Sequence, residues 1–60
     1  NAVLEKLGEE TTEVILASKD GDTEQVAHEA ADLVYHLLVL LSMADMDLED
    51  LLAELERRHR

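Results

Sequence analysis

The sequence predicts an all-α protein, a hairpin of two long helices followed by a short third helix. Its 60 residues include no proline and only two glycines, so little interrupts a helix. Apolar side chains recur at helical spacings, which indicates helices with one apolar face. The one strong turn signal within the chain is Asp20-Gly21-Asp22. No stretch alternates apolar and polar residues for long enough to predict a sheet.

The first helix is expected to run from about Ala2 to Lys19. Its apolar side chains are spaced three, four and seven residues apart, and they are Val3, Leu4, Leu7, Val14 and Ile15. This spacing predicts an apolar stripe along the helix.

The second helix should begin after Asp22 and end at about Ala44 or Asp45. Asp22 can accept from the first free N–H groups, and Gln25 stands three residues on, as in a capping box. From Leu33 to Leu41 the helix is apolar nearly all round and must be covered on most sides. One long and one short partner in the same chain cannot do this. We therefore expect a second copy to complete a four-helix-type core by dimerisation.

The third helix should follow a break at Asp45-Met46-Asp47, with Asp47 as its N-cap. Its apolar stripe consists of four leucines, Leu48, Leu51, Leu52 and Leu55. Arginines near its end suit the helix dipole, and they are Arg57, Arg58 and Arg60. The length allows one domain, residues 1–60, and makes a lone copy marginally stable, which also favours self-association.

Composition argues against several classes of partner and of functional site. A net charge of −10 argues against binding nucleic acid, which requires clustered lysine and arginine. Without cysteine there is no disulfide, thiolate zinc site or thiol nucleophile. The longest nearly apolar run, Leu33 to Ala44, has 12 residues, fewer than the ~20 that span a bilayer. We therefore expect a cytoplasmic protein with no membrane partner.

Two pairs of carboxylates, each spaced three residues apart, are placed unusually for a surface. Glu29 and Asp32 share an apolar face of the second helix, and Glu10, which precedes Glu13, borders the apolar stripe of the first. Buried carboxylates are costly unless they are paired or bind a cation. Glu13 and Glu29 each stand eight residues from Gly21, so antiparallel helices bring them level, about 12 Å from the turn. Four convergent carboxylates suit Mg²⁺ or Mn²⁺ rather than zinc.

The pattern alone leaves two interpretations open. An E-x-x-E pair on a helix is most often a solvated face, and the chain would then be a non-catalytic helical dimerisation module. The second acidic pair, at a matching distance from the same turn, favours a metal site.

Longer segments resemble a known family. The stretch Lys6–Glu13 (KLGEETTE) and the stretch Glu29–His36 (EAADLVYH), joined through Lys19–Asp22, are similar to the phosphoribosyl-ATP pyrophosphatases. These belong to the MazG-like all-α nucleotide pyrophosphatases, whose motif is EExxE followed by ExxD. The resemblance covers essentially the whole chain, the ending included. It implies Mg²⁺-dependent hydrolysis of the α–β phosphoanhydride of phosphoribosyl-ATP to phosphoribosyl-AMP and pyrophosphate, the second step of histidine biosynthesis.

The resemblance implies metal binding by four residues, Glu10, Glu13, Glu29 and Asp32. A bound cation would reverse the local sign of a chain that otherwise repels a polyanionic substrate. Glu9, the first acid of the motif, would be a general base or a ligand to a second metal, with a solvated face as the alternative. We therefore take Glu9, Glu10 and Glu13 as the candidate catalytic residues.

Basic residues near the motif supply candidate substrate contacts. Lys6 should contact a phosphate oxygen or pair with Glu10, and Lys19 is either a charge at the helix end or a phosphate contact. His36, one turn after Asp32, is either a core residue or a donor to a ligand carboxylate. The other histidines, His28 and His59, are expected at the surface, and Tyr35 at an interface or in the core.

The chain departs from the family at its start. Members usually carry a further N-terminal segment with basic and hydroxyl residues, and residues 1–60 are expected to form the domain without it. A housekeeping nucleoside triphosphate pyrophosphatase of the same superfamily is the nearest alternative. Tyr35-His36 and the closing helix favour the histidine enzyme.

Overall fold

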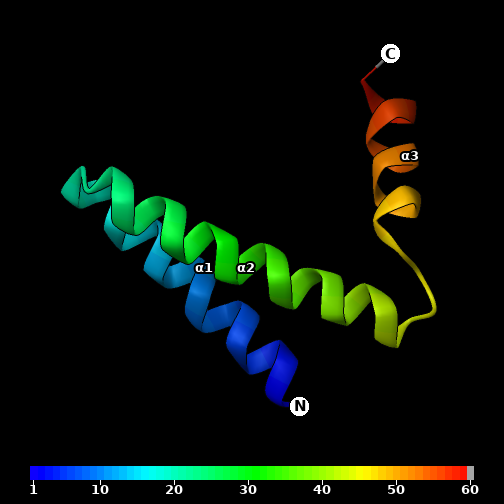
Figure 1. Cartoon of the computed structure of the whole chain (residues 1–60), viewed down its shortest axis with the longest axis horizontal. Helices are drawn as coiled ribbons and strands as arrows, with labels where there is room; N and C mark the ends of the chain where they lie inside the picture. The colour runs from blue at the N-terminus through cyan, green and yellow to red at the C-terminus, as the bar shows by residue number, and fades with distance from the viewer. Residues whose placement is uncertain (60) are drawn as a thin grey trace.

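The chain folds into an antiparallel helical hairpin with a third helix at one end (Figure 1). The structure, a computed structural model, describes residues 1–59. Helix α1 spans Ala2–Asp20, α2 spans Thr23–Met43 and α3 spans Leu48–Arg58. The all-α class and the order of the helices are confirmed, with ends one or two residues from those expected.

The turn between α1 and α2 is a Schellman motif centred on Gly21. Gly21 has φ 71° and ψ 19°, a left-handed conformation that glycine adopts without steric cost. Its N–H donates to the carbonyl of Ser18, and the N–H of Asp22 donates to the carbonyl of Ala17. These bonds satisfy the last carbonyls of α1 and turn the chain back on itself.

Helix α2 begins after the expected N-cap, Asp22, but the expected capping box does not form. The Asp22 carboxylate accepts from the backbone N–H of Gln25 at 3.0 Å. The expected capping box is wrong, because the Gln25 side chain turns along the helix and donates to Glu29 at 2.9 Å. A complete capping box forms at α3, where the side chains of Asp47 and Asp50 each accept a hydrogen bond from the other residue's backbone N–H.

The contact between α1 and α2 is narrow. Among the described residues only Glu10, Ala17 and Glu29 are buried. Helix α1 faces α2 through positions three and four apart, with half-buried Val3, Leu7 and Val14 in the same row as Glu10 and Ala17. The expectation that Leu4 and Ile15 share this stripe is wrong, since they are 54% and 55% exposed. Each follows a contact residue directly, and about 100° of rotation per residue carries it away from α2.

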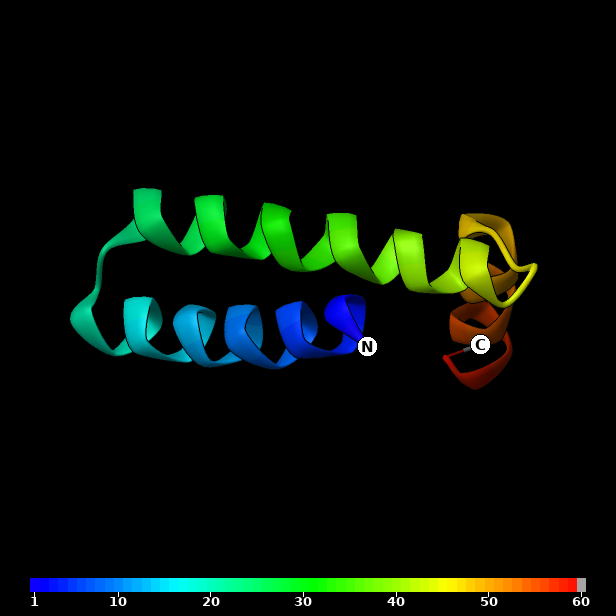
Figure 2. The same ribbon diagram turned by 90° about the horizontal axis from the view of Figure 1, so that it is seen from below.

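Much apolar surface is uncovered within one chain. An open groove on the outer face of α2 is lined by Ala27, Ala30, Ala31, Val34, Tyr35 and Leu38. Helix α3 extends away from the hairpin in Figure 1, and Figure 2 shows it at the end of α2 that lies farthest from the α1–α2 turn. The radius of gyration is 13.2 Å, against about 10 Å for a compact domain of this length. Tyr35, 62% exposed, is therefore not a core residue of the single chain.

Helix α2 is also long and apolar enough to cross a membrane, judged by length and composition alone. The core helix of a soluble protein meets the same test, so this is weak support for a membrane span. The absence of a membrane partner stays a prediction.

Candidate active site

Two of the expected metal ligands are buried where α1 faces α2. Glu10 comes from α1 and Glu29 from α2, and each is 8% exposed. A carboxylate removed from water needs hydrogen bonds or a cation. Both have a partner in this structure, and the partners differ.

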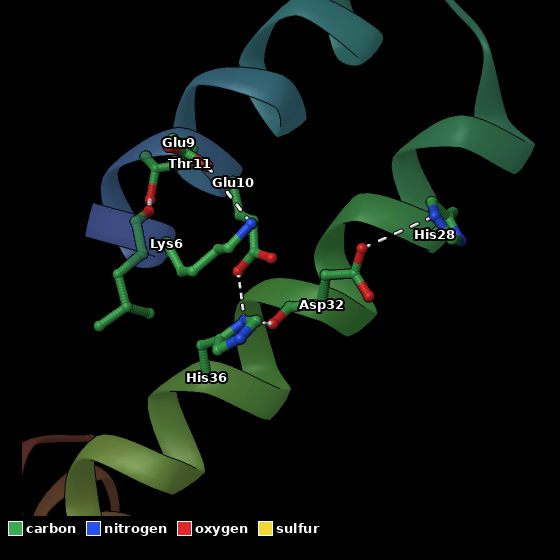
Figure 3. A network of polar contacts seen from close by, with 8 residues as sticks. Lys6, Glu9, Glu10, Thr11, His28, Asp32 and His36 are labelled. Carbon is green, nitrogen blue, oxygen red and sulfur yellow. Dashed lines mark hydrogen bonds and ion pairs between the residues drawn. The ribbon is translucent and has the colours of Figure 1, made fainter. Parts of the chain in front are cut away.

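Glu10 is held by a histidine from the opposite helix (Figure 3). Nδ1 of His36 lies 2.7 Å from Oε1 of Glu10 and 3.1 Å from the backbone carbonyl of Asp32. Both neighbours are acceptors, so Nδ1 carries a proton and donates to them. The side chains are 22% and 10% exposed, which protects the contact from water. His36 therefore links α1 to α2 at the level of the acidic residues.

Glu29 lies against a second carboxylate of α1. Gln25 donates to Oε2 of Glu29 at 2.9 Å and fixes that group. Hydrogen bonding with Glu29 and then charge repulsion from it raise the pKa of the Glu13 carboxyl above its ordinary value. Desolvation and the charges of Glu10 and Glu9 add smaller effects in the same direction. The site thus carries an excess of negative charge.

Asp32 turns toward a histidine of its own helix instead. Its Oδ2 lies 3.6 Å from Nε2 of His28. Ligand atoms of His28, Glu29 and Asp32 lie within 4.8 Å of one another, the one compact group of this kind in residues 1–59. Neither Glu10, which is turned to His36, nor Glu13 belongs to this group, so the four expected carboxylates do not form a single compact set here. His28 was expected to be a plain surface residue, and its four-residue spacing to Asp32 is the signal that could have revealed it.

The lysines lie at the margins. Lys6 pairs with Glu9 at 3.7 Å rather than with Glu10, and both side chains are more than half exposed. Lys19 is exposed in the last turn of α1. Both lysines can still meet a substrate, since neither side chain is buried.

A comparison with known protein families identifies the family of this chain. The model of the family described as "PRA-PH: Phosphoribosyl-ATP pyrophosphohydrolase" matches residues 1–59. The chain belongs to this family. It is the family that the stretches Lys6–Glu13 and Glu29–His36 resemble, and each stretch holds one of the two acidic pairs.

Individual relatives agree with the family assignment. The chain is 76% identical over 58 residues to a phosphoribosyl-ATP pyrophosphatase of Haloarcula marismortui, covering 97% of this chain and 59% of the relative. It is 66% identical over 58 residues to that of Halobacterium salinarum, covering 97% and 61%. It is also 55% identical over 60 residues to a Gloeobacter violaceus protein named histidine biosynthesis bifunctional protein HisIE, covering all of this chain and 27% of that protein. The chain thus spans about three fifths of the length of the first two relatives.

Proposed function

We propose that the chain hydrolyses the α–β phosphoanhydride of phosphoribosyl-ATP, releasing phosphoribosyl-AMP and pyrophosphate in the second step of histidine biosynthesis. The family match over residues 1–59 supports this substrate over ordinary nucleoside triphosphates. The observation that carries the proposal is the burial of two acids, Glu10 on α1 and Glu29 on α2, in the contact between the two helices. Two carboxylates in so narrow a contact are costly for a purely structural hairpin, even with the one hydrogen bond that each accepts from His36 or Gln25.

We also propose that Glu10, Glu13, Glu29 and Asp32 hold Mg²⁺ or Mn²⁺. Their donors are carboxylate oxygens, which these ions prefer. Crowding that raises the pKa of Glu13 is what a divalent cation would relieve. When bound, the ion would supply the positive charge that a chain of net charge −10 needs in order to receive a triphosphate.

The surrounding side chains have separate tasks in this proposal. His36 holds the Glu10 carboxylate in place, and Gln25 does the same for Glu29. Glu9 is exposed on α1, and in this proposal it accepts the proton of the attacking water. Lys6, 3.7 Å from Glu9, and Lys19 would contact phosphate oxygens.

We further propose a homodimer in which a second copy covers the outer face of α2. The groove there is apolar, and all the residues that line it belong to α2. Replacing Val34, 52% exposed in this groove, by glutamate should give a monomer in light scattering, while Glu56→Gln should leave a dimer. An unchanged mass for Val34→Glu would contradict this interface. A cytoplasmic location and the absence of nucleic-acid and membrane partners stay predictions from composition.

Pyrophosphate release tests the activity. Phosphoribosyl-ATP and a panel of ordinary nucleoside triphosphates would be supplied with Mg²⁺ or with EDTA. We expect release from phosphoribosyl-ATP with Mg²⁺ and none with EDTA. Glu29→Gln should lose at least about tenfold in rate, in line with the loss of a group that positions a metal. Glu56→Gln, an exposed acid on α3, is the matched control and should behave as the parent.

Two results would contradict the proposal. Equal release from ordinary triphosphates would assign the chain to the housekeeping branch. An equal thermal midpoint with and without Mg²⁺, together with no release, would leave a helical dimerisation module as the better description.

A further inference from the structure

The leucine stripe of α3 and the apolar groove of α2 are both uncovered within one chain. We propose that they cover each other between two copies, with α3 of one copy lying antiparallel in the α2 groove of the other. The inference rests on the homodimer proposed above and identifies the segment that fills its groove. Each copy would give its α3 and receive that of its partner, as a twofold dimer requires.

The first support is the matching spacing of the two surfaces. The stripe of α3 consists of Leu48, Leu51, Leu52 and Leu55. The groove of α2 includes Ala27, Ala30, Ala31 and Val34. In both sets the later residues follow the first by three, four and seven positions, so each set is one helix face two turns long. Leu48 and Leu55 are 47% and 45% exposed, and the small alanines leave room for such large side chains at a close helix contact.

The short link between α2 and α3 keeps the stripe from this part of its own chain. Helix α2 ends in a turn in which the N–H of Met46 donates to the carbonyl of Leu41 at 2.8 Å. Leu41 lies seven residues after Val34, about 10.5 Å along the helix. The two residue steps from Met46 to Leu48 span at most about 7 Å. While this turn holds, Leu48 cannot come level with Val34 of its own chain, and the other end of the groove is farther still.

Charge decides the direction of α3 in the groove, because the spacing is the same when it is read from either end. Arg57 and Arg58 lie in the last turn of α3. The α1–α2 turn and the start of α2 carry three exposed acids, Asp20, Asp22 and Glu24. An antiparallel α3 brings its basic end to these acids of the partner, and such complementarity fixes the register of an interface. A parallel α3 would bring the same end to the apolar second half of α2.

The arginines remain able to make this contact. Nε of Arg57 and Nε of Arg58 donate to Glu54 of the same helix. A guanidinium carries five N–H donors, so each arginine has further donors for an acid of the second copy. Both side chains are about two-thirds exposed.

Cross-linking between two kinds of chain tests the contact. The chain has no cysteine, so each variant would carry a single thiol. Chains with Ala27→Cys would be unfolded together with isotope-labelled chains with Leu55→Cys, refolded, oxidised and weighed intact. The label gives the mixed dimer a mass of its own. We expect a disulfide-linked mixed dimer as a main product, since the bond forms where Cα atoms lie about 4.4–6.8 Å apart.

A second pair and two controls fix the direction. Val34→Cys with Leu48→Cys is the other antiparallel pair and should also link. Ala27→Cys with Leu48→Cys tests the parallel direction and should give only traces of mixed dimer. Ala27→Cys with Ala53→Cys, which places the thiol on the side of α3 away from the leucines, should also give only traces. Circular dichroism of each variant would show that its helices are formed.

The outcomes separate this inference from the proposals on which it rests. A parent that is a dimer in light scattering, with no mixed link in either antiparallel pair, would overturn the α3 contact and leave the homodimer standing. A link of Ala27→Cys to Leu48→Cys in place of Leu55→Cys would overturn the antiparallel direction. A chain carrying both Ala27→Cys and Leu55→Cys that links only within itself would place α3 on its own α2, against the proposal. A monomeric parent would contradict the homodimer and this inference together, whereas pyrophosphate release tests the hydrolysis separately.

Discussion

Replacing His36 by alanine should destabilise the hairpin, because it removes the hydrogen-bond donor of a buried carboxylate. Nδ1 of His36 lies 2.7 Å from Oε1 of Glu10, and the Glu10 side chain is only 10% exposed. A hydrogen bond to a charged group contributes about 1.5–3 kcal/mol. The second contact, to the carbonyl of Asp32, adds little, since a helical carbonyl already accepts a backbone N–H.

We therefore expect the free energy of unfolding to fall by about 2 kcal/mol. For a domain of this length that corresponds to a thermal midpoint lower by roughly 8–16 °C. His36→Asn is the informative second variant, since an asparagine amide can donate from nearly the position of Nδ1. It should recover more than half of the loss.

Urea unfolding followed by circular dichroism measures these differences, in EDTA and at one protein concentration for all variants. A loss below about 0.5 kcal/mol for His36→Ala would place it among ordinary surface substitutions and refute the reasoning. Equal losses for the alanine and asparagine variants would show that packing, rather than the hydrogen bond to Glu10, is what His36 contributes.

Three further changes test the charges and caps. Glu13→Gln should stabilise the metal-free protein at neutral pH, because Glu29 raises the pKa of Glu13. A carboxyl group whose pKa is raised in the folded state stabilises the fold fully at a pH below its pKa in the unfolded chain. This stabilisation is lost as the pH rises through the pKa of the folded state. The parent's thermal midpoint in EDTA should therefore drop more across that window than the variant's, with Glu56→Gln following the parent. Glu54→Gln should weaken α3 at neutral pH but not in acid, since hydrogen bonds from two arginines of that helix lower the pKa of Glu54. That stability is present above the unfolded pKa and lost as pH falls through the folded pKa, and circular dichroism with and without high salt would measure it. Asp47→Ala should cost about 1 kcal/mol by removing the α3 cap, seen as faster amide exchange in the first turn of that helix.

Local rules explain the parts of the fold that were predictable. The caps at Asp22 and Asp47 and the turn at Gly21 each depend on residues within about four positions, so the sequence alone indicates them. Which of two adjacent apolar residues faces a partner depends on how the helices cross. The periodicity therefore grouped Leu4 and Ile15 with the contact stripe, although the helix rotation turns both outward.

Part of the candidate site was likewise predictable from the sequence, and part was not. The level placement of Glu13 and Glu29 follows from the fixed rise of a helix, and the raised pKa of Glu13 agrees with their proximity. The pairing of Lys6 with Glu9 and the approach of His28 to Asp32 involve exposed side chains with several partners in reach. Such pairs differ by less than about 1 kcal/mol, too little for a sequence pattern to rank them.

The tight turn at Gly21 also limits how this stretch of chain can change in length. One residue inserted between Glu13 and Gly21 would rotate the acids of α1 by about 100° and move them about 1.5 Å along the helix. A matching insertion in α2 would bring the two acidic pairs back to the same distance from the turn, but it would not turn them back toward the contact between the helices. Blocks that make up nearly whole turns in both helices, such as about seven or about eleven residues, would preserve both. Natural insertions and deletions should therefore collect in residues 44–47, between α2 and α3, where a change of length leaves the acidic pairs in register.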